Sequence, residues 1–356
     1  MPSGSGLGGL RTCLSHRLTL LQAKATFTVM IHSRIRILKN HRISLGILDN
    51  KRIAVIGFGS QGKAQALNLR DSGFTPIIGL RPSSRSRKAA VAEGFRVVDI
   101  DVAVRSADLI AVMIPDHLHG ELFRRYIYGN IRPGQSFIFA HGLSVHFGLV
   151  ERPRGIRFLL VAPHAPGIRL RENYLIGKGV PAFIAAVVNS SAALKLAAAY
   201  GKAIGCARAG LIVTTFENEA IGDIFGEQAV LCGGLAGLLR GGFDTLVDSG
   251  MPPQNAYLEC VYQLDLIVDL IKRFGIEGMY RRISVTARRG SHHAENIVIN
   301  RQSLAGMSKL LRRIKSGEFV KELLKTAGGS NGSIRKKSRT DLLDRTALMF
   351  SRMFDT

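Results

Sequence analysis

Two acidic residues one helical turn apart mark the segment with the clearest chemical potential. Asp223 and Glu227 are four positions apart, and the residues around them are mostly apolar. At that spacing both carboxylates project from one side of an α-helix. Carboxylates in an apolar segment are costly unless a cation neutralises them. The spacing therefore predicts oxygen ligands for a hard divalent cation such as Mg²⁺.

A second apolar segment repeats the spacing. Glu259 and Gln263 are also four apart, within residues 257–270. Two helices that each offer oxygen atoms one turn apart can face one another across a metal ion. One such pair alone is better explained as a core helix with solvated acids. Two pairs together with a nucleotide motif favour the metal site.

A glycine-rich turn indicates where a nucleotide binds. Residues 52–57 form an apolar strand run, and Gly57, Gly59 and Gly62 follow in the G-x-G-x-x-G pattern before a helical segment. The first glycine allows the tight turn, the second lets the backbone approach a pyrophosphate, and the third lets helix and strand pack closely. The helix N-terminus then offers amide donors to the anion. The candidate cofactor-binding residues of this turn are Gly57, Phe58, Gly59, Ser60, Gln61 and Gly62.

The end of the next predicted strand, residues 76–80, indicates which nucleotide is bound. NAD-specific folds place an acid near this point for the ribose hydroxyls. This chain has Arg81, Ser84, Arg85 and Ser86 instead, whose charge and hydroxyl donors suit a 2′-phosphate. We therefore expect NADPH; the alternative is an exposed polar loop.

Strand and helix patterns continue to alternate, which predicts an α/β fold with a parallel sheet. The further strand runs are residues 108–115, 135–140, 158–162 and 182–188. His141 follows directly on one of these strands, at the end where such sheets bind ligands. A lone histidine is more often structural, but this location makes a role beside the nicotinamide equally plausible.

Composition and the pattern of predicted strands and helices divide the chain into four expected regions. Residues 1–45 are expected to be poorly structured, either an organellar transit peptide or an extension upstream of a true start at Met30. Residues 46–212 are expected to form the Rossmann domain, and 213–327 an all-helical domain for metal and substrate. The Gly/Ser-rich and basic residues 328–356 are expected to be a disordered tail.

Composition limits the possible partners. The net charge of this 356-residue chain is +23, but its basic residues are spread along it without an aromatic platform, so we expect no specific nucleic-acid binding. We see no uninterrupted apolar run of the ~20 residues needed to span a membrane. The four cysteines lack metal-ligand spacing and fit free thiols in a reducing compartment. We expect a cytoplasmic protein, or an organellar one if residues 1–29 are a transit peptide.

Several motifs together resemble the ketol-acid reductoisomerases of the short, class I type, from about Leu45 to Leu324. The segment 222–234 is the most specific of them, because we would not expect it in an unrelated Rossmann protein. The other matching segments are residues 57–62, 66–73, 79–81, 115–116, 139–142, 161–163, 166–167 and 283–287.

The resemblance implies a Rossmann domain followed by a knotted all-helical domain, completed by a partner in a homodimer or higher homo-oligomer. It also implies two Mg²⁺ ions, NADPH and a 2-hydroxy-3-keto acid substrate of the 2-acetolactate type. An alkyl group would migrate first and the keto group would then be reduced, in valine and isoleucine biosynthesis. The residue roles that it implies are metal binding by Asp223, Glu227 and Glu259, catalysis by His141, Glu259 and Ser284, substrate contact by Ser284, and cofactor binding by Arg81, Ser84, Ser86, Pro115, Asp116 and Gly167.

The sequence departs from the family pattern at a few of these places. Gln263 stands where a second Glu is usual, His164-Ala165 where Lys-Gly is usual, and Arg288 where Glu is usual. Lys63 and Gln65 occupy positions where histidines are common. Two alternatives therefore stay open: a diverged relative that only reduces a 2-keto acid, and a non-catalytic nucleotide-binding relative.

Overall fold

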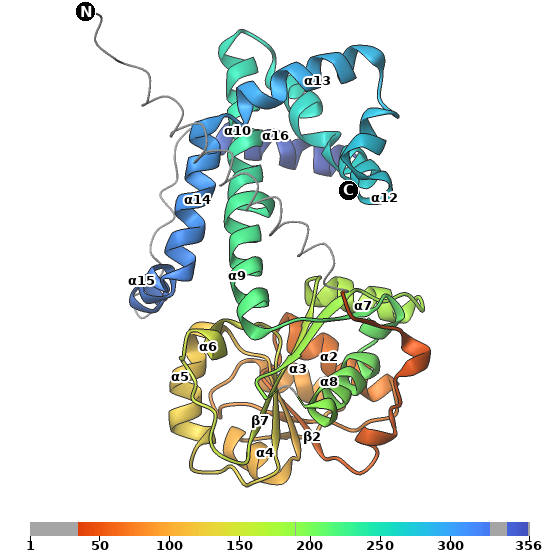
Figure 1. Cartoon of the computed structure of the whole chain (residues 1–356), viewed down its shortest axis with the longest axis vertical. Coiled ribbons are helices and arrows are strands. Elements are labelled where there is room, and N and C mark those ends of the chain that lie inside the picture. Colours follow the sequence, from red (N-terminus) through yellow and green to blue (C-terminus); the bar gives the residue numbers. More distant parts are fainter. Residues whose placement is uncertain (1–34, 189, 328–339, 355–356) are drawn as a thin grey trace, which may run out of the picture. The chain divides into compact units, whose positions relative to one another are not determined.

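The computed structural model describes residues 35–188, 190–327 and 340–354 (Figure 1). They divide into two compact units. Unit 1 holds the described residues through Met113 together with Gly134–Ala140 and Ile156–Thr214. Unit 2 holds Ile114–Pro133, His141–Gly155 and the described residues from Thr215 onwards.

Within the described residues, unit 1 is built on one nine-stranded sheet of order β1-β9-β8-β7-β6-β5-β2-β3-β4. The strands are β1 Ile37–Leu38, β2 Ile53–Ile56, β3 Ile77–Gly79, β4 Val97–Val98, β5 Leu109–Val112, β6 Ser136–Phe139, β7 Arg157–Pro163, β8 Ala182–Ala186 and β9 Leu211–Val213. The strand order reverses between β2 and β5, and β2 is buried along its whole length because parallel neighbours and helices cover it.

The predicted α/β fold is confirmed, but the sheet is mixed rather than wholly parallel. β7 and β8 pair antiparallel, with Pro163 opposite Ala182, and β1 pairs antiparallel with β9. The helix between β7 and β8 packs against α2 (Ser60–Asp71) and does not carry the chain back across the sheet. β8 therefore starts beside the end of β7 and runs in the opposite direction.

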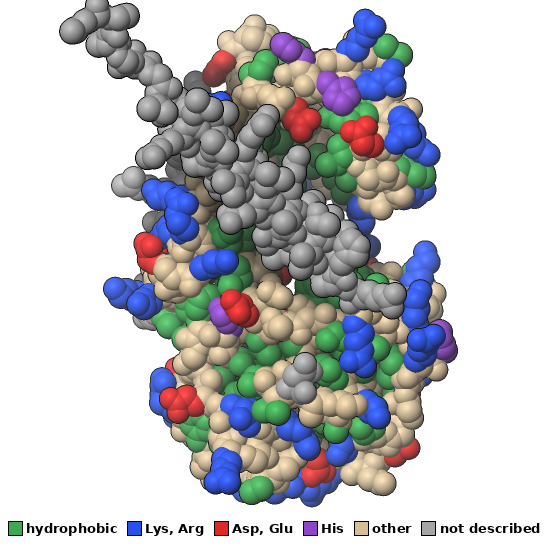
Figure 2. Space-filling view, viewed as in Figure 1, with side chains coloured by type: hydrophobic (Ala, Val, Ile, Leu, Met, Phe, Trp, Pro, Cys, Tyr) green, Lys and Arg blue, Asp and Glu red, His purple; other side chains and the backbone are tan. Residues whose placement is uncertain are grey.

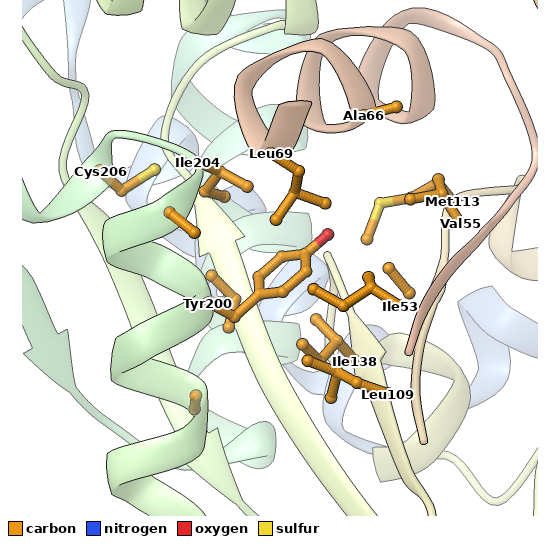
Figure 3. Close-up of a cluster of buried hydrophobic side chains, with 14 of the residues drawn as sticks. Ile53, Val55, Ala66, Leu69, Leu109, Met113, Ile138, Tyr200, Ile204 and Cys206 are labelled. Atoms are coloured by element: carbon orange, nitrogen blue, oxygen red, sulfur yellow. The ribbon is translucent and has the colours of Figure 1, made fainter. Parts of the chain in front are cut away.

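Helices cover the sheet of unit 1. Besides α2 they are α3 Ser86–Ala92, α4 Ile100–Ser106, α7 Gly167–Leu175 and α8 Ser191–Ala203, with short turns η1 Asn40–Arg42, η2 Gly46–Leu48 and η5 Cys206–Arg208. Figure 3 shows the buried cluster between sheet and helices, with the Tyr200 ring directed from α8 toward Leu69 of α2. Tyr200 is fully buried, and burial of such large side chains dominates the core energy.

A hydrogen-bond chain connects this core to the glycine turn. The Tyr200 hydroxyl donates to Gln65 Oε1 at 2.8 Å, and Gln65 Nε2 donates to Gln61 Oε1 at 3.1 Å. Gln61 Nε2 in turn donates to the Ala165 carbonyl at 2.8 Å. Gln65 is fully buried, so these partners satisfy a side chain that would otherwise be costly in the core. The chain fixes the orientation of Gln61 in the first turn of α2.

Unit 2 is helical in the residues described. Its elements are η3 Asp116–Leu118, α5 His119–Leu122, η4 Phe123–Ile127, α6 Leu143–His146, α9 Phe216–Gly226, η6 Glu227–Leu231, α10 Gly233–Asp248, α11 Pro253–Tyr257, η7 Leu258–Tyr262, α12 Leu264–Tyr280, α13 Val285–Val298, α14 Arg301–Lys315, α15 Glu318–Ala327 and α16 Thr340–Met353. The elements η4, η6 and η7 are π-helical turns, a form that often marks functional sites.

One apolar cluster of unit 2 joins α6 to α9. Leu143 of α6 packs with Ile224 of α9, and Ile314 of α14 and Val320 of α15 complete the buried cluster. α6 follows the strand that ends at Phe139, so this packing places the residues after β6 against the first turns of α9.

The helix that runs from Phe216 to Asp248 is long and apolar enough to cross a membrane by length and composition alone. Only 6% of its most apolar window is buried. The same test passes core helices of soluble proteins, so the observation by itself shows an exposed apolar surface and no more.

The structure revises two of the predicted regions. Within 1–45, β1 and η1 are ordered elements, and β1 pairs with β9; residues 1–34, including Met30, lie outside the described residues. The predicted disordered tail is wrong for Thr340–Met353, which forms α16 and packs against α11. Thr346 and Phe350, one helical turn apart, are buried, and Phe350 stacks on Tyr257 of α11, so α16 has a face that packs.

The predicted boundary at residue 213 lies beside Thr215, where the long part of unit 2 begins, but it omits two earlier segments. Residues 114–133 and 141–155 follow β5 and β6 and cluster with the helices of unit 2. Local sequence pattern could not assign them, because their affiliation rests on tertiary packing.

Candidate functional site

The glycine turn after β2 has the geometry of an anion cradle. Gly57 has φ 99°, a left-handed conformation that favours glycine. A Cβ on Gly62 would overlap the Gly57 carbonyl, whereas a Cβ on Gly59 would meet nothing within 4 Å. No side chain caps the N-terminus of α2, so its first amides stay available for an acceptor. The turn therefore fits a dinucleotide pyrophosphate.

Gly167 packs directly on this turn. A Cβ at Gly167 would overlap the Ser60 carbonyl, so only glycine lets the N-terminus of α7 approach the N-terminus of α2 this closely. Pro166 precedes it as the N-cap of α7, without a side-chain capping bond. The structure thus gives Gly167 a packing reason for standing beside the predicted cofactor site.

The loop after β3 carries the predicted 2′-phosphate residues. Arg81 and Arg85 are exposed, and neither forms an ion pair with another residue in the described ranges. Ser84 is half-buried, and its backbone N–H closes a turn on the Arg81 carbonyl at 3.0 Å. Ser86 begins α3. Arg87, which sequence reasoning passed over, pairs with Asp99 at 2.9 Å and donates to the Leu80 carbonyl, so it fixes the loop.

In unit 2, His141 lies against Asp223. His141 Nε2 is 2.9 Å from Asp223 Oδ2, and the His141 side chain is only 19% exposed. The α6–α9 packing creates this pair from residues that are 82 positions apart in the sequence (223 − 141). Leu143 N–H points to His141 Nδ1 at 3.2 Å, which suits a neutral ring with its proton on Nε2.

A buried glutamate, Glu219, holds the same segment. Glu219 Oε2 accepts the Gly142 N–H at 2.5 Å, and the residue is 3% exposed. A Cβ on Gly142 would come within 2.5 Å of the Phe216 carbonyl oxygen and 2.7 Å of Glu219 Oε2. Sequence reasoning missed Glu219. It could have been found, because positions 219, 223 and 227 continue the four-residue spacing.

The charged groups of this cluster change one another's pKa values. Burial alone lowers the pKa of His141, but the Asp223 hydrogen bond and the charges of Glu219, Asp116 and Asp223 outweigh it and raise that pKa to about 9. Burial raises the pKa of Glu219 to about 7, against the lowering effects of His141 and the Gly142 N–H. The second proton of His141 goes on Nδ1, where it replaces the hydrogen bond from the Leu143 N–H and faces Asp116 Oδ1 at 3.9 Å.

Asp116, predicted as a cofactor residue, lies at the start of η3 and joins this cluster. Its Oδ1 is buried without a hydrogen-bond partner and lies 3.9 Å from both His119 Nδ1 and His141 Nδ1. The preceding Pro115 serves as the N-cap of η3. Asp116 therefore presents an unsatisfied acceptor next to the protonatable ring of His141.

His119 is held in one tautomer beside the cluster. Its Nε2 donates to the Ile114 carbonyl at 3.0 Å, so Nδ1 accepts from the Ser144 hydroxyl at 2.8 Å. Burial lowers the pKa of His119, with Asp116 opposing, and keeps this ring neutral while His141 is charged. Sequence reasoning did not identify His119 or Ser144.

Glu227 begins the π-helical turn η6, one helical turn beyond Asp223. Burial and the Asp223 charge raise the pKa of Glu227, and His141 lowers it. Two carboxylates on the same side of the helix are oxygen donors of the kind that a hard cation requires.

Comparison with known proteins identifies the family of this chain. Residues 47–210 match the model of the acetohydroxy acid isomeroreductase NADPH-binding domain, and residues 216–345 match that of the ketol-acid reductoisomerase C-terminal domain. The chain belongs to the ketol-acid reductoisomerase family. A ketol-acid reductoisomerase (NADP(+)) of Pyrobaculum aerophilum is 46% identical over 302 residues, which cover 85% of this chain and 92% of that protein.

Solved structures agree with this family and its fold. An NADH-preferring ketol-acid reductoisomerase from an uncultured archean superposes with a TM-score of 0.84 at 35% identity, covering 90% of this chain and 100% of that one. A semialdehyde dehydrogenase NAD-binding protein from Cupriavidus necator superposes with a TM-score of 0.57 at 17% identity, covering 74% of this chain and 99% of that one, and shares the fold alone.

The ketol-acid reductoisomerase residues predicted on the later helices are not brought to this cluster. Among the described residues, no three His, Cys, Asp or Glu side chains form a group that could hold a metal ion. Glu259 is exposed in the π-helical turn η7, and its Oε2 accepts from Gln263 Nε2 at 3.2 Å. Ser284 is the N-cap of α13, where its hydroxyl oxygen accepts the Ala287 N–H. Within one chain, the ligand set is therefore incomplete.

The structure explains some of the departures from the ketol-acid reductoisomerase pattern. Gln65 is part of the buried Tyr200–Gln61 chain, where an amide both donates and accepts. Lys63 pairs with Glu93 at 2.7 Å on the surface. The ring of His164 lies edge-on to Phe183, with centroids 4.4 Å apart. Nothing in the structure explains Arg288.

Proposed function

We propose that this protein is a working ketol-acid reductoisomerase. It would convert 2-acetolactate-type acids into 2,3-dihydroxy acids by Mg²⁺-dependent alkyl migration and NADPH reduction, as in valine and isoleucine biosynthesis. The observation that carries the proposal is the convergence of His141 with Asp223 and Glu219, directly after a strand of a sheet that also carries the glycine turn. The family assignment supports the same activity.

The residues present fit the groups that this reaction needs. Asp223 and Glu227 would bind Mg²⁺ through carboxylate oxygens. Burial and, second to it, the Asp223 charge raise the pKa of Glu227, and a bound cation would favour its charged form. The turn at Gly59 would hold the pyrophosphate of NADPH. When bound, Mg²⁺ polarises the substrate oxygens and NADPH supplies the hydride.

The protein's own side chains would manage the protons. In the metal-free protein His141 is held charged by Asp223 and Glu219, and a charged imidazole can donate a proton to an oxygen that gains negative charge. Glu219 would act as a positioning residue, because its carboxylate accepts the Gly142 N–H and so fixes the backbone next to His141. The neutral His119 would orient the Ser144 hydroxyl and leave the acid role to His141.

NADPH is the proposed reductant because Arg81 and Arg85, after β3, are exposed cations that form no ion pair with any described residue. A similar archaeal ketol-acid reductoisomerase prefers NADH, so the affinities of this chain for NADPH and NADH have to be compared directly. Figure 2 shows Lys and Arg side chains scattered over the visible face, in keeping with general basicity and without a stripe that suggests nucleic acid.

A second copy of the chain would complete the site. The helices of unit 2 leave many large apolar side chains at least 40% exposed. Single exposed apolar residues are normal on a protein surface, whereas so many on one set of helices indicate an interaction surface. They include Val230, Leu231, Leu238, Leu266, Ile276 and Leu304. Burying them against the same helices of a partner would remove that surface from water and bring the partner's second carboxylate segment to Asp223. We propose this homodimer in place of a membrane location for the helix from Phe216 to Asp248.

The decisive experiment incubates the purified protein with 2-acetolactate, Mg²⁺ and NADPH and follows cofactor oxidation. Turnover that requires both Mg²⁺ and NADPH is the expected result. Oxidation only with 3-hydroxy-3-methyl-2-oxobutyrate, in which the methyl group has already migrated, would leave a 2-keto acid reductase and exclude the isomerisation. No turnover with either acid, while NADPH still binds, would indicate a non-catalytic relative.

The dimer is tested separately by sedimentation equilibrium. Full-length protein should sediment at twice the monomer mass of 38.7 kDa. A Leu238→Glu substitution at an exposed position of α10 should shift it toward monomer, and a monomeric wild-type protein with full activity would overturn this part of the proposal.

A further inference from the structure

A cavity in unit 1, formed by β1, η1, η2 and the start of α8, has no role in the proposed reaction. It has a volume of about 330 Å³, at the lower end of the ~300–1,000 Å³ typical of small-molecule sites. Its lining residues come from two segments far apart in the sequence, one between Arg36 and Ile47 and the other between Ser191 and Ala198, and α8 packs against η2. The glycine turn and the His141 cluster contribute no lining residue.

The floor of the cavity is apolar. Leu38, Ile43 and Ile47 line it from the N-terminal segment, and Leu194 and Ala198 line it from α8. Ile43, Leu194 and Ala198 are buried, while Ile47 is 37% exposed toward solvent. Such a floor offers a favourable surface for a short hydrocarbon group.

The rim is positively charged and has no counterion among the described residues. Arg36, Arg42 and Lys195 line the cavity, and none of the three forms an ion pair with another residue in the described parts of the chain. No described lining residue is acidic; the remaining polar ones are Ser44 and Ser191. In contrast, Lys202 further along α8 donates to the Asn40 and Ile43 carbonyls and fastens the N-terminal segment.

The helix end adds to this positive potential. Ser191 is the first residue of α8, whose first turn contains no acid, and Lys195 follows one turn later. A helix N-terminus carries a partial positive charge, so a lysine close to it and two arginines opposite it are mutually unfavourable. The Ser190 hydroxyl caps one amide of this turn, that of Ala193. An anion at the rim would relieve the repulsion.

We propose that this cavity is a binding site for a small amphipathic carboxylate, an anionic head on a tail of a few carbons. The head would lie between Arg42, Lys195 and the first turn of α8, and the tail on Leu38, Ile47 and Leu194. Such a site shares no residue with those assigned to the reaction, so a ligand there would act on the protein without competing for those residues.

Calorimetric titration of the full-length protein with octanoate tests the proposal. The expected result is saturable binding with a dissociation constant on the order of millimolar or tighter. Acetate keeps the charge without the tail, and 1-octanol keeps the tail without the charge; both should bind at least about tenfold more weakly. Equal binding of inorganic phosphate, or of 1-octanol, would overturn the amphipathic specificity.

Two variants locate the site. Ser191→Asp puts a negative charge at the rim where an acid suits the helix, so folding is kept while octanoate should bind about tenfold more weakly. Ser303→Asp makes the same change in the first turn of α14, in unit 2, and should leave the affinity unchanged. Lys195→Gln should also weaken binding, and its control Lys309→Gln, on an exposed face of α14, should not.

Three results would reject the site. The first is an absence of saturable octanoate binding. The second is equal weakening by Ser191→Asp and Ser303→Asp. The third is binding that appears only after residues 1–34 are removed, because the cavity would then belong to the chain's own N-terminal segment.

Discussion

His141 Nε2 lies 2.9 Å from Asp223 Oδ2, and this contact joins the segment after β6 to α9. Because Asp223 both accepts this bond and contributes charge, it helps to raise the pKa of His141 to about 9. The same carboxylate is the proposed ligand of Mg²⁺. Metal binding and the protonation of His141 therefore compete for one oxygen pair.

Asp223→Asn should lower the pKa of His141 and abolish Mg²⁺-dependent turnover. The amide oxygen can still accept the hydrogen bond, but the charge that favours imidazolium and cation is lost. Ring-proton chemical shifts of His141 against pH, in metal-free protein, measure the first effect, and the acetolactate assay measures the second. Asp269→Asn, which removes an exposed partner of Arg273, is the control. Turnover that survives Asp223→Asn would remove the metal assignment.

Glu219→Gln should also lower the pKa of His141, because the buried charge is removed while an amide oxygen can still accept the Gly142 N–H. The wild-type pKa of Glu219 is raised to about 7, above its ordinary value of 4.5. The folded state thus holds a proton that the unfolded chain releases, and stability falls as pH rises through that window. Urea unfolding between about pH 4.5 and 7 should show a shallower decline for Glu219→Gln. An unchanged slope would place Glu219 in a solvated environment.

Gly142→Ala should destabilise the fold by about 1–3 kcal/mol, because its Cβ would press on the Phe216 carbonyl and on Glu219. Gly222→Ala is the matched control on α9, where a Cβ meets nothing within 4 Å. It should stabilise the helix by about 0.5–1 kcal/mol. Thermal unfolding distinguishes the two, and equal effects would mean that the close approach of residue 142 to α9 does not exist in solution.

Gln263→Glu should raise Mg²⁺ affinity, since it restores a carboxylate one turn beyond Glu259, where the amide now donates to Glu259 Oε2. Calorimetry with Mg²⁺ on the oligomeric protein measures this. Gln254→Glu adds the same charge to the exposed face of α11 and should have no effect. If both variants behave like wild type, position 263 is not close to the metal.

Ser84→Asp should weaken NADPH binding far more than NADH binding, because a carboxylate repels the 2′-phosphate and suits a free ribose hydroxyl. Fluorescence titration with both nucleotides gives the ratio of affinities. Ser106→Asp, at the half-buried last residue of α4, serves as the control. Equal losses for the two nucleotides would show that the loop after β3 does not contact the 2′-position.

The sequence by itself determined the Rossmann unit and its glycine turn, because Gly57, Gly59 and Gly62 meet local backbone requirements that a linear pattern records. It also placed Asp223 and Glu227 on one helical face, since helical period alone decides that. Their π-helical continuation and the order of α16 were not visible, because both depend on packing beyond the segment.

Only the tertiary structure decided that His141 meets Asp223 and that Glu219 buries its charge under Gly142. These contacts join positions 82 (223 − 141) and 77 (219 − 142) residues apart, and they exist because the apolar faces of α6 and α9 pack together. The structure likewise left Glu259 exposed instead of joining it to the first pair. Local spacing records which residues share a face, whereas the docking of one face on another is set by the burial of apolar surface along the whole chain.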